Sequence, residues 1–207
     1  MNAPFDTESA IGASAKRQPT PDHQVAVIGL GYIGLPTAAV LASFGWDVCG
    51  VDVSENVVDT VNAGGVHIEE RDLDKLVGEA IETGRLKAST EVPTAHFYMI
   101  AVPTPLTDQN LPDVSFVEQA TRSIAPNILP GACVIVESTS PVGTTEKVAQ
   151  IIAEMRPDLA VPVYGEQRGG DIALAYCPER VLPGKIVREL VQNDRVIGGL
   201  TPECAAR

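Results

Sequence analysis

A glycine-rich turn near the start of the chain constrains the fold more than any other feature. Residues 25–36 read VAVIGLGYIGLP, in which four apolar residues run directly into the pattern G-x-G-x-x-G. The apolar run predicts a buried parallel strand, and residues 35–44 are apolar enough for a packed helix. A strand, this glycine pattern and a helix, in that order, are typical of a dinucleotide-binding βαβ unit.

Each glycine of the turn has its own expected role. Gly29 makes the tight turn, Gly31 leaves room for a pyrophosphate at the backbone, and Gly34 lets the helix pack closely on the strand. The anion would lie on the unpaired N–H groups of the helix N-terminus. By itself the pattern is weak evidence, because any glycine-rich turn from strand to helix matches it.

An acidic residue follows at the spacing that a dinucleotide site needs. Residues 46–51 read as a second apolar strand that ends at Asp52, 18 residues after Gly34, close to the ~20 expected of a ribose-binding acid. A carboxylate there would accept both ribose hydroxyls of NAD and repel the 2′-phosphate of NADP, and no Lys or Arg follows until Arg71. The alternative for Asp52 is a helix N-cap, a role that Ser54 fills equally well. We predict NAD as the cofactor.

The charge balance and the hydropathy pattern exclude several classes of partner. The 207 residues carry 15 Lys and Arg against 27 Asp and Glu, a formal net charge of −12, without a basic run. Nucleic acid and anionic membranes are therefore not expected as partners. No segment approaches the ~20 apolar residues of a membrane span, and the N-terminus lacks a signal-peptide pattern, so we expect a cytoplasmic protein. The four dispersed cysteines predict reduced, mostly buried thiols and no metal site.

The remaining chain alternates between predicted strands and helices. Residues 1–23 have no periodicity and predict a disordered leader, and residues 24–207 predict one domain. Further strands are predicted at residues 97–102, 133–136, 172–176 and 195–199, and further helices at residues 54–62, 69–83, 114–128 and 144–155. This order specifies an α/β fold: a Rossmann-like, doubly wound, mainly parallel sheet with helices on both faces.

Polar side chains follow three consecutive predicted strands, at the carboxyl ends where ligands bind in open parallel sheets. Thr104 stands between two prolines after one strand, and the segment ESTSPVGTT follows the next. In that segment Thr139 can reach the cleft, while Thr144 or Thr145 can cap the following helix. The alternatives are a plain proline turn for Thr104 and simple caps for the other hydroxyls. Polar groups at successive strand ends favour one shared site.

Five segments in this order resemble the UDP-glucose/GDP-mannose dehydrogenase family: VIGLGYIGLP, VDV, IAVPTP, ESTSPVGTT and AYCPERVLPG. The resemblance runs from about Val25 to the last residue. The wording PERVLPG, continued by NDRVIGG, looks most like the branch that acts on UDP-N-acetyl-D-mannosamine, with UDP-N-acetylglucosamine and UDP-glucose as alternative substrates. The family implies a four-electron oxidation of the sugar C6 alcohol to a carboxylate with two NAD⁺, by homodimeric enzymes of surface polysaccharide synthesis.

The resemblance also implies roles for individual residues. The NAD pyrophosphate and ribose site is implied at Gly29, Gly31, Tyr32, Ile33, Gly34 and Asp52, and the cofactor cleft at Thr104, Thr139 and Thr145. Glu179, with Thr139, resembles the acid that positions water at the reacting carbon, and Arg180 and Val181 resemble contacts to the nucleotide sugar. Without the resemblance, Glu179 would be a surface acid in a proline-rich loop.

The sequence departs from the family pattern in one respect. The family's nucleophilic cysteine lies in a G-G-H-C segment beyond a central helix, and the sequence contains no such segment. Neither Cys177 nor Cys204 matches it. We therefore expect an NAD-binding domain truncated before the central helix and the second nucleotide-binding domain, which binds NAD without turnover. The alternatives are a hydroxyacid dehydrogenase of the 6-phosphogluconate type and a non-catalytic dinucleotide-binding module.

Overall fold

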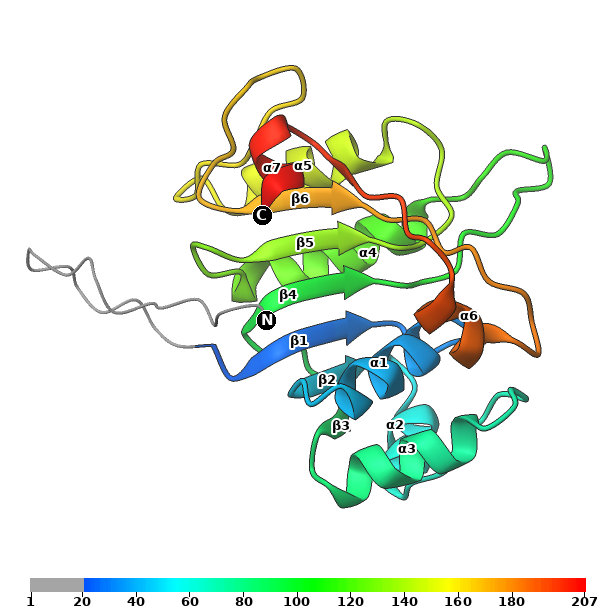
Figure 1. Cartoon of the computed structure of the whole chain (residues 1–207). Coiled ribbons are helices and arrows are strands. Elements are labelled where there is room, and N and C mark those ends of the chain that lie inside the picture. The colour runs from blue at the N-terminus through cyan, green and yellow to red at the C-terminus, as the bar shows by residue number, and fades with distance from the viewer. Residues whose placement is uncertain (1–20) are drawn as a thin grey trace, which may run out of the picture.

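The computed structural model describes residues 21–207, which form a single sheet of seven strands with helices around it (Figure 1). The strands are β1 His23–Ile28, β2 Val48–Val51, β3 Leu86–Ser89, β4 Ala95–Ile100, β5 Cys133–Val136, β6 Ala173–Tyr176 and β7 Gly198–Gly199. Their order across the sheet is β3-β2-β1-β4-β5-β6-β7, and all neighbours are parallel except β7, which is antiparallel to β6. The predicted mainly parallel α/β fold is confirmed.

Helices cover both faces of the sheet. They are α1 Gly34–Ser43, α2 Glu55–Asn62, α3 Leu73–Glu82, α4 Ser115–Ile124, the 3-10 turn η1 Ala125–Asn127, α5 Thr144–Met155, α6 Ile186–Gln192 and α7 Pro202–Ala206. In β1, Val25 and Val27 join the core under α1 and α3, whereas Ala26 and Ile28 join the core under α4 and α5. Alternate residues of a strand point to opposite faces, so a continuously apolar strand must be covered twice.

The strand order reverses direction between β1 and β4. From β1 the chain builds β2 and β3 on one side and then returns to place β4 on the other side. In open parallel sheets such a reversal leaves a crevice at the carboxyl ends of the two strands. Because β1, β2, β4, β5 and β6 are parallel, the loops that follow them leave the same edge, where the arrowheads lie in Figure 1.

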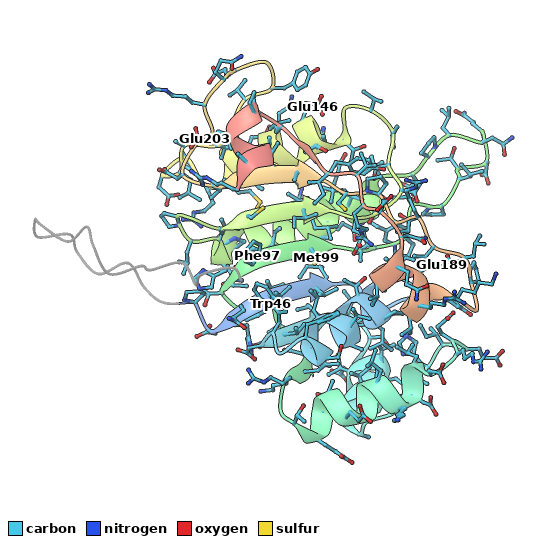
Figure 2. All side chains as sticks on the ribbon, viewed as in Figure 1. Trp46, Phe97, Met99, Glu146, Glu189 and Glu203 are labelled. Carbon is cyan, nitrogen blue, oxygen red and sulfur yellow. The ribbon has the colours of Figure 1, made fainter. Side chains whose placement is uncertain are left out.

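At the opposite, amino-terminal edge of the sheet, two aromatic side chains pack against each other. The rings of Trp46 and Phe97 meet edge to face with their centroids 5.9 Å apart (Figure 2). Glu189 on α6 lies at the other end of the sheet in the same view. Among the described residues, no helix is both long enough and apolar enough to cross a membrane.

Several predicted elements are confirmed with shifted ends. The helix predicted from residue 69 begins at Leu73, because Asp72 adopts a left-handed φ of 62°. The helix predicted at residues 114–128 is α4, and it tightens into η1 at Pro126, which has no N–H for an α-helical bond. The strand predicted at residues 195–199 is reduced to the two glycines of β7.

Other parts of the prediction need correction. β3 and α6 are not predicted, since β3 is a half-exposed edge strand and α6 follows a proline-glycine turn. The leader predicted for residues 1–23 lies mostly outside the described residues, but His23 already belongs to β1. No side chain caps α5: its N-cap is Gly143, and Thr144 Oγ1 instead donates to Pro141 O at 2.8 Å.

The cysteines behave as the small apolar residues that the sequence predicts. Cys49, Cys177 and Cys204 are buried and Cys133 is half-buried, and all are free thiols. Burial raises the pKa of the Cys49 and Cys133 thiols to about 11. These two thiols therefore stay protonated at neutral pH.

Candidate functional site

The turn between β1 and α1 has the geometry expected of the three glycines. Gly29 has a φ of 93°, and its N–H donates to Val51 O at 2.7 Å. A Cβ at Gly34 would lie only 1.7 Å from Gly29 O, so glycine alone lets α1 begin this close to the strand. A Cβ at Gly31 would meet no atom within 4 Å. The space beside the Gly31 backbone is therefore not filled by protein atoms.

The N-terminus of α1 offers unpaired backbone donors next to this space. Within residues 21–207, the N–H groups of Gly31, Tyr32 and Ile33 donate to no protein acceptor. The helix has no side-chain cap and no acidic residue in its first turn. The free N–H groups and the helix dipole together favour an anion at this position.

Asp52 connects the end of β2 to the glycine turn. Its Oδ2 accepts a hydrogen bond from the Leu30 N–H at 2.9 Å, and its Oδ1 accepts one from the Ser54 N–H at 3.0 Å. Asp52 is not the N-cap of α2, because Ser54 holds that position. The carboxylate is half-exposed, and each oxygen keeps a further lone pair that can accept from a ribose hydroxyl.

Three polar residues from three loops form a hydrogen-bonded chain at the carboxyl edge. Thr104 Oγ1 donates to Thr139 O at 2.6 Å, and Thr139 Oγ1 donates to Glu179 Oε1 at 2.7 Å. Glu179 Oε2 is buried and has no partner among the described residues. Together with Ile33 from the glycine turn, these residues line a hollow of about 190 Å³. The structure thus brings the ends of three predicted strands into one place.

Beyond the glycine turn and Asp52, three predicted site residues remain, and all three lie outside this hollow. Thr145 is the half-buried second residue of α5, Arg180 is exposed, and Val181 is half-buried. None of them contributes to the lining of the hollow. Larger hollows, such as one of about 470 Å³ between the N-termini of α3 and α6, contain none of the predicted residues.

A buried ion pair beside the hollow is absent from the sequence prediction. Glu137, the first residue after β5, is fully buried, and its carboxylate accepts from the Arg195 guanidinium and from Thr37 Oγ1 on α1. Burial raises the pKa of Glu137, Arg195 and Thr37 oppose this rise, and Glu179 adds to it. The partners are 58 and 100 positions away in the chain, so no local spacing reveals them. The available signal is an acidic residue directly after an apolar strand.

Comparison with known proteins identifies the family. Residues 23–207 match the family model described as the UDP-glucose/GDP-mannose dehydrogenase family, NAD binding domain. The chain belongs to the UDP-glucose/GDP-mannose dehydrogenase family. The match confirms the resemblance drawn from the five segments, and it makes NAD the cofactor. It also decides against a hydroxyacid dehydrogenase of the 6-phosphogluconate type.

Relatives of known name cover most of the chain. It is 57% identical over 184 residues to the UDP-N-acetyl-D-mannosamine dehydrogenase of Escherichia coli (strain K12), covering 88% of the chain and 43% of that protein. It is 52% identical over 181 residues to the NDP-N-acetyl-D-galactosaminuronic acid dehydrogenase of Ralstonia nicotianae, covering 87% of the chain and 43% of that protein. The chain thus spans less than half the length of these members of the family.

Solved structures of the family agree with this fold. The UDP-N-acetyl-mannosamine dehydrogenase of Staphylococcus aureus is similar with a TM-score of 0.78 at 42% sequence identity. The alignment covers 87% of this chain and 42% of that one. The enzyme from Pyrococcus horikoshii gives a TM-score of 0.78 at 40% identity, covering 88% of this chain and 42% of that one.

Proposed function

We propose that this chain binds NAD⁺ along the carboxyl edge of its sheet and supplies the cofactor half of a nucleotide-sugar 6-dehydrogenase. The pyrophosphate would lie on the free N–H groups of Gly31, Tyr32 and Ile33, and the adenosine ribose on Asp52. The nicotinamide end would then reach the hollow at Thr104. The observation that carries the proposal is that Asp52 after β2, the glycine turn after β1 and the hollow beyond β4 follow one another in that order along a single edge of the sheet.

The residues present fit NAD rather than NADP. Asp52 already accepts two backbone hydrogen bonds, which hold its carboxylate at the turn with lone pairs left for a ribose. A 2′-phosphate at the same place would meet this negative charge. The open space at Gly31 is where a pyrophosphate must approach the backbone.

The proposed substrate is UDP-N-acetyl-D-mannosamine. The relative that is 57% identical carries this substrate in its name, and one that is 52% identical is named for an N-acetylgalactosaminuronic acid. A solved UDP-glucose dehydrogenase is only 28% identical. An N-acetylhexosamine is therefore favoured over UDP-glucose, and UDP-N-acetylglucosamine remains the nearer alternative.

The proposed reaction converts the sugar C6 alcohol to a carboxylate. One alcohol, two NAD⁺ and one water give one carboxylate, two NADH and three protons, with two hydrides leaving C6. In this chain, Glu179 Oε2 would hold the water near C6, while Thr139 keeps the other carboxylate oxygen in place. Arg180 and Val181 would contact the nucleotide sugar, and Thr145, at the start of α5, would line the cofactor cleft. The enzyme would act in the cytoplasm, as a homodimer, in surface polysaccharide synthesis.

Calorimetric titration of the chain with NAD⁺ and NADP⁺ tests the cofactor site. We expect NAD⁺ to bind at least ten times more tightly than NADP⁺, about 1.4 kcal/mol in binding free energy. Asp52→Asn should reduce this preference, whereas Asp59→Asn, an exposed acid on α2, should leave it unchanged. Equal affinity for both cofactors, or no NAD⁺ binding by a folded chain, would refute the proposal.

Turnover is tested separately, because the chain spans 43% of its relatives. We expect the chain alone to bind NAD⁺ and to release no NADH when UDP-N-acetyl-D-mannosamine is added. Rapid NADH formation by this chain, followed at 340 nm by the usual absorbance assay, would show that the chemistry needs nothing beyond it. A non-catalytic module is favoured only if no sugar nucleotide is oxidised when the chain forms part of a full-length enzyme.

A further inference from the structure

We propose that Glu137 and Arg195 are positioning residues that hold the loop carrying Glu179 against helix α1, across the cofactor cleft. This loop, residues 177–185 between β6 and α6, is called the Glu179 loop below. The inference rests on the proposed function, because it concerns the surroundings of the same hollow. Neither Glu137 nor Arg195 lines the hollow, so both act through Glu179 and α1 rather than on a ligand.

The half of the Glu179 loop nearer α6 is fastened by side chains. Leu182, Pro183 and Gly184 are exposed, so apolar burial contributes little to its position. The Leu182 N–H donates to Glu189 Oε2 at 2.8 Å, and the Gly184 N–H donates to Glu70 Oε2 at 2.7 Å. Glu189 lies on α6, as Figure 2 shows. These contacts fix the far half of the loop and leave Glu179 itself to other partners.

The half of the loop nearer β6 is held by the segment that precedes β7. Asn193 Nδ2 donates to Arg180 O at 2.6 Å, directly after Glu179. Two residues further on, the Arg195 guanidinium contacts the buried carboxylate of Glu137. Val196, which follows, is 59% exposed and provides no apolar anchor. Polar contacts therefore set the position of this half of the loop.

Glu137 connects three parts of the site, two through its carboxylate and one through the backbone that leads to Thr139. It accepts from Arg195 and, at 3.4 Å, from Thr37 on α1. Two residues after it, Thr139 donates to Glu179 Oε1 at 2.7 Å. A displacement of Arg195 would thus reach Glu179 by two routes, through the backbone of Arg180 and through the strand end that carries Thr139.

Overall stability alone does not account for this ion pair. Glu137 is fully buried and the Arg195 side chain is 25% exposed, so both charges lose much of their hydration. Buried ion pairs are often replaceable by apolar residues without loss of stability, because desolvation offsets the attraction. What an apolar pair cannot supply is a directed link from α1 to a solvent-exposed loop. The geometry therefore indicates that the ion pair positions the Glu179 loop relative to α1.

Amide hydrogen exchange of the 207-residue chain tests the assignment without any ligand. Arg195→Gln should raise exchange of the Leu182 N–H, the first hydrogen-bonded amide after Glu179 in the loop, at least ten-fold, while exchange within β1 changes much less. Arg195→Gln leaves the buried Glu137 carboxylate without its charged partner. The double variant Glu137→Gln with Arg195→Gln removes that charge, so its thermal stability should recover while fast exchange in the loop persists. Arg195→Lys, which keeps the charge but lacks the forked donor, should rescue the loop only in part. Arg188→Gln is the matched control, an exposed arginine whose side chain, within residues 21–207, bonds only to Gln192.

The outcomes separate positioning from simple stabilisation. An equal rise of exchange in the loop and in β1 would mean that the ion pair only stabilises the fold, which would overturn the proposal. Unchanged exchange in the loop of a folded Arg195→Gln chain would also overturn it. A parallel NAD⁺ titration should show weaker binding in Arg195→Gln and unchanged binding in Arg188→Gln. If the wild-type chain binds no NAD⁺, the proposed function fails, while the exchange comparison still decides the role of the pair.

Discussion

Alanine substitutions at Gly31 and Gly34, three residues apart in one turn, should have opposite effects on the stability of the fold. At Gly34 the new methyl carbon would lie 1.7 Å from Gly29 O, half the distance at which ordinary contact begins, 3.4 Å. The obstacle is backbone, so α1 or the turn must shift. Overpacking of this kind costs about 1–3 kcal/mol of unfolding free energy. At about 2–4 °C per kcal/mol for a domain of this size, Gly34→Ala should lower the melting temperature by about 2–12 °C.

Gly31→Ala should leave the fold intact and remove the ligand. The methyl group would meet no protein atom within 4 Å, and φ lies outside the left-handed region. Replacing Gly by Ala at such a position stabilises a protein by about 0.4–1 kcal/mol through the unfolded state. The same methyl would occupy the space proposed for the pyrophosphate, so NAD⁺ affinity should fall at least ten-fold, or about 1.4 kcal/mol.

Both variants are measured in the same two assays, thermal unfolding by circular dichroism and calorimetric titration with NAD⁺. The expected pattern is a destabilised Gly34→Ala chain and a stable Gly31→Ala chain that no longer binds. A Gly31→Ala chain that melts normally and binds NAD⁺ as well as the wild type would place the pyrophosphate elsewhere. A Gly34→Ala chain with an unchanged melting temperature would show that the turn is looser than its geometry implies.

Three further predictions concern the core and its pH dependence. Tyr98→Phe leaves the Ala95 N–H and Asn127 O without their hydroxyl partner, which should cost about 1–3 kcal/mol in urea unfolding. Burial raises the pKa of Tyr98 from 10.0 to about 12. Its contribution to stability is therefore complete below pH 10 and is lost as the pH rises to 12. Urea titrations across this pH range should show a smaller loss of unfolding free energy in Tyr98→Phe than in the wild type. Arg156→Lys loses the donors to Ala125 O and Ile128 O and should cost about 1–2 kcal/mol, whereas Asp158→Ala, an exposed partner, should cost under about 1 kcal/mol.

The strands that sequence predicts well are those buried on both faces. β5 is an uninterrupted apolar run between turn residues, and both of its ends are predicted correctly. β3 is not predicted, because it is an edge strand with one side, that of Lys87, facing solvent. α6 fails because its seven residues follow proline and glycine, which indicate a turn locally. Continuous burial leaves a pattern in the sequence, and exposure at an edge removes it.

The candidate site is predictable from the sequence at the glycine turn and at the strand ends. The glycine turn and Asp52 follow from spacing, and the placement of Thr139 follows from its position after a buried strand. The contacts between Arg195 and Glu137 and between Asn193 and Arg180 have no such signature, because each joins segments that only the folded topology brings together. Glu179 is intermediate: the family resemblance selects it, and its contact with Thr139 appears only in three dimensions.

The short last strand has a consequence for how the chain behaves at high concentration. β7 spans only two glycines, and α7 crowds directly onto it, since a Cβ at Gly199 would lie 2.2 Å from the Ala205 nitrogen. A strand from a neighbouring molecule could pair with only two residues at this edge, and α7 would block its approach. Intermolecular strand addition, the first step of many fibrillar aggregates, is thereby directed to the opposite margin, where β3 lies.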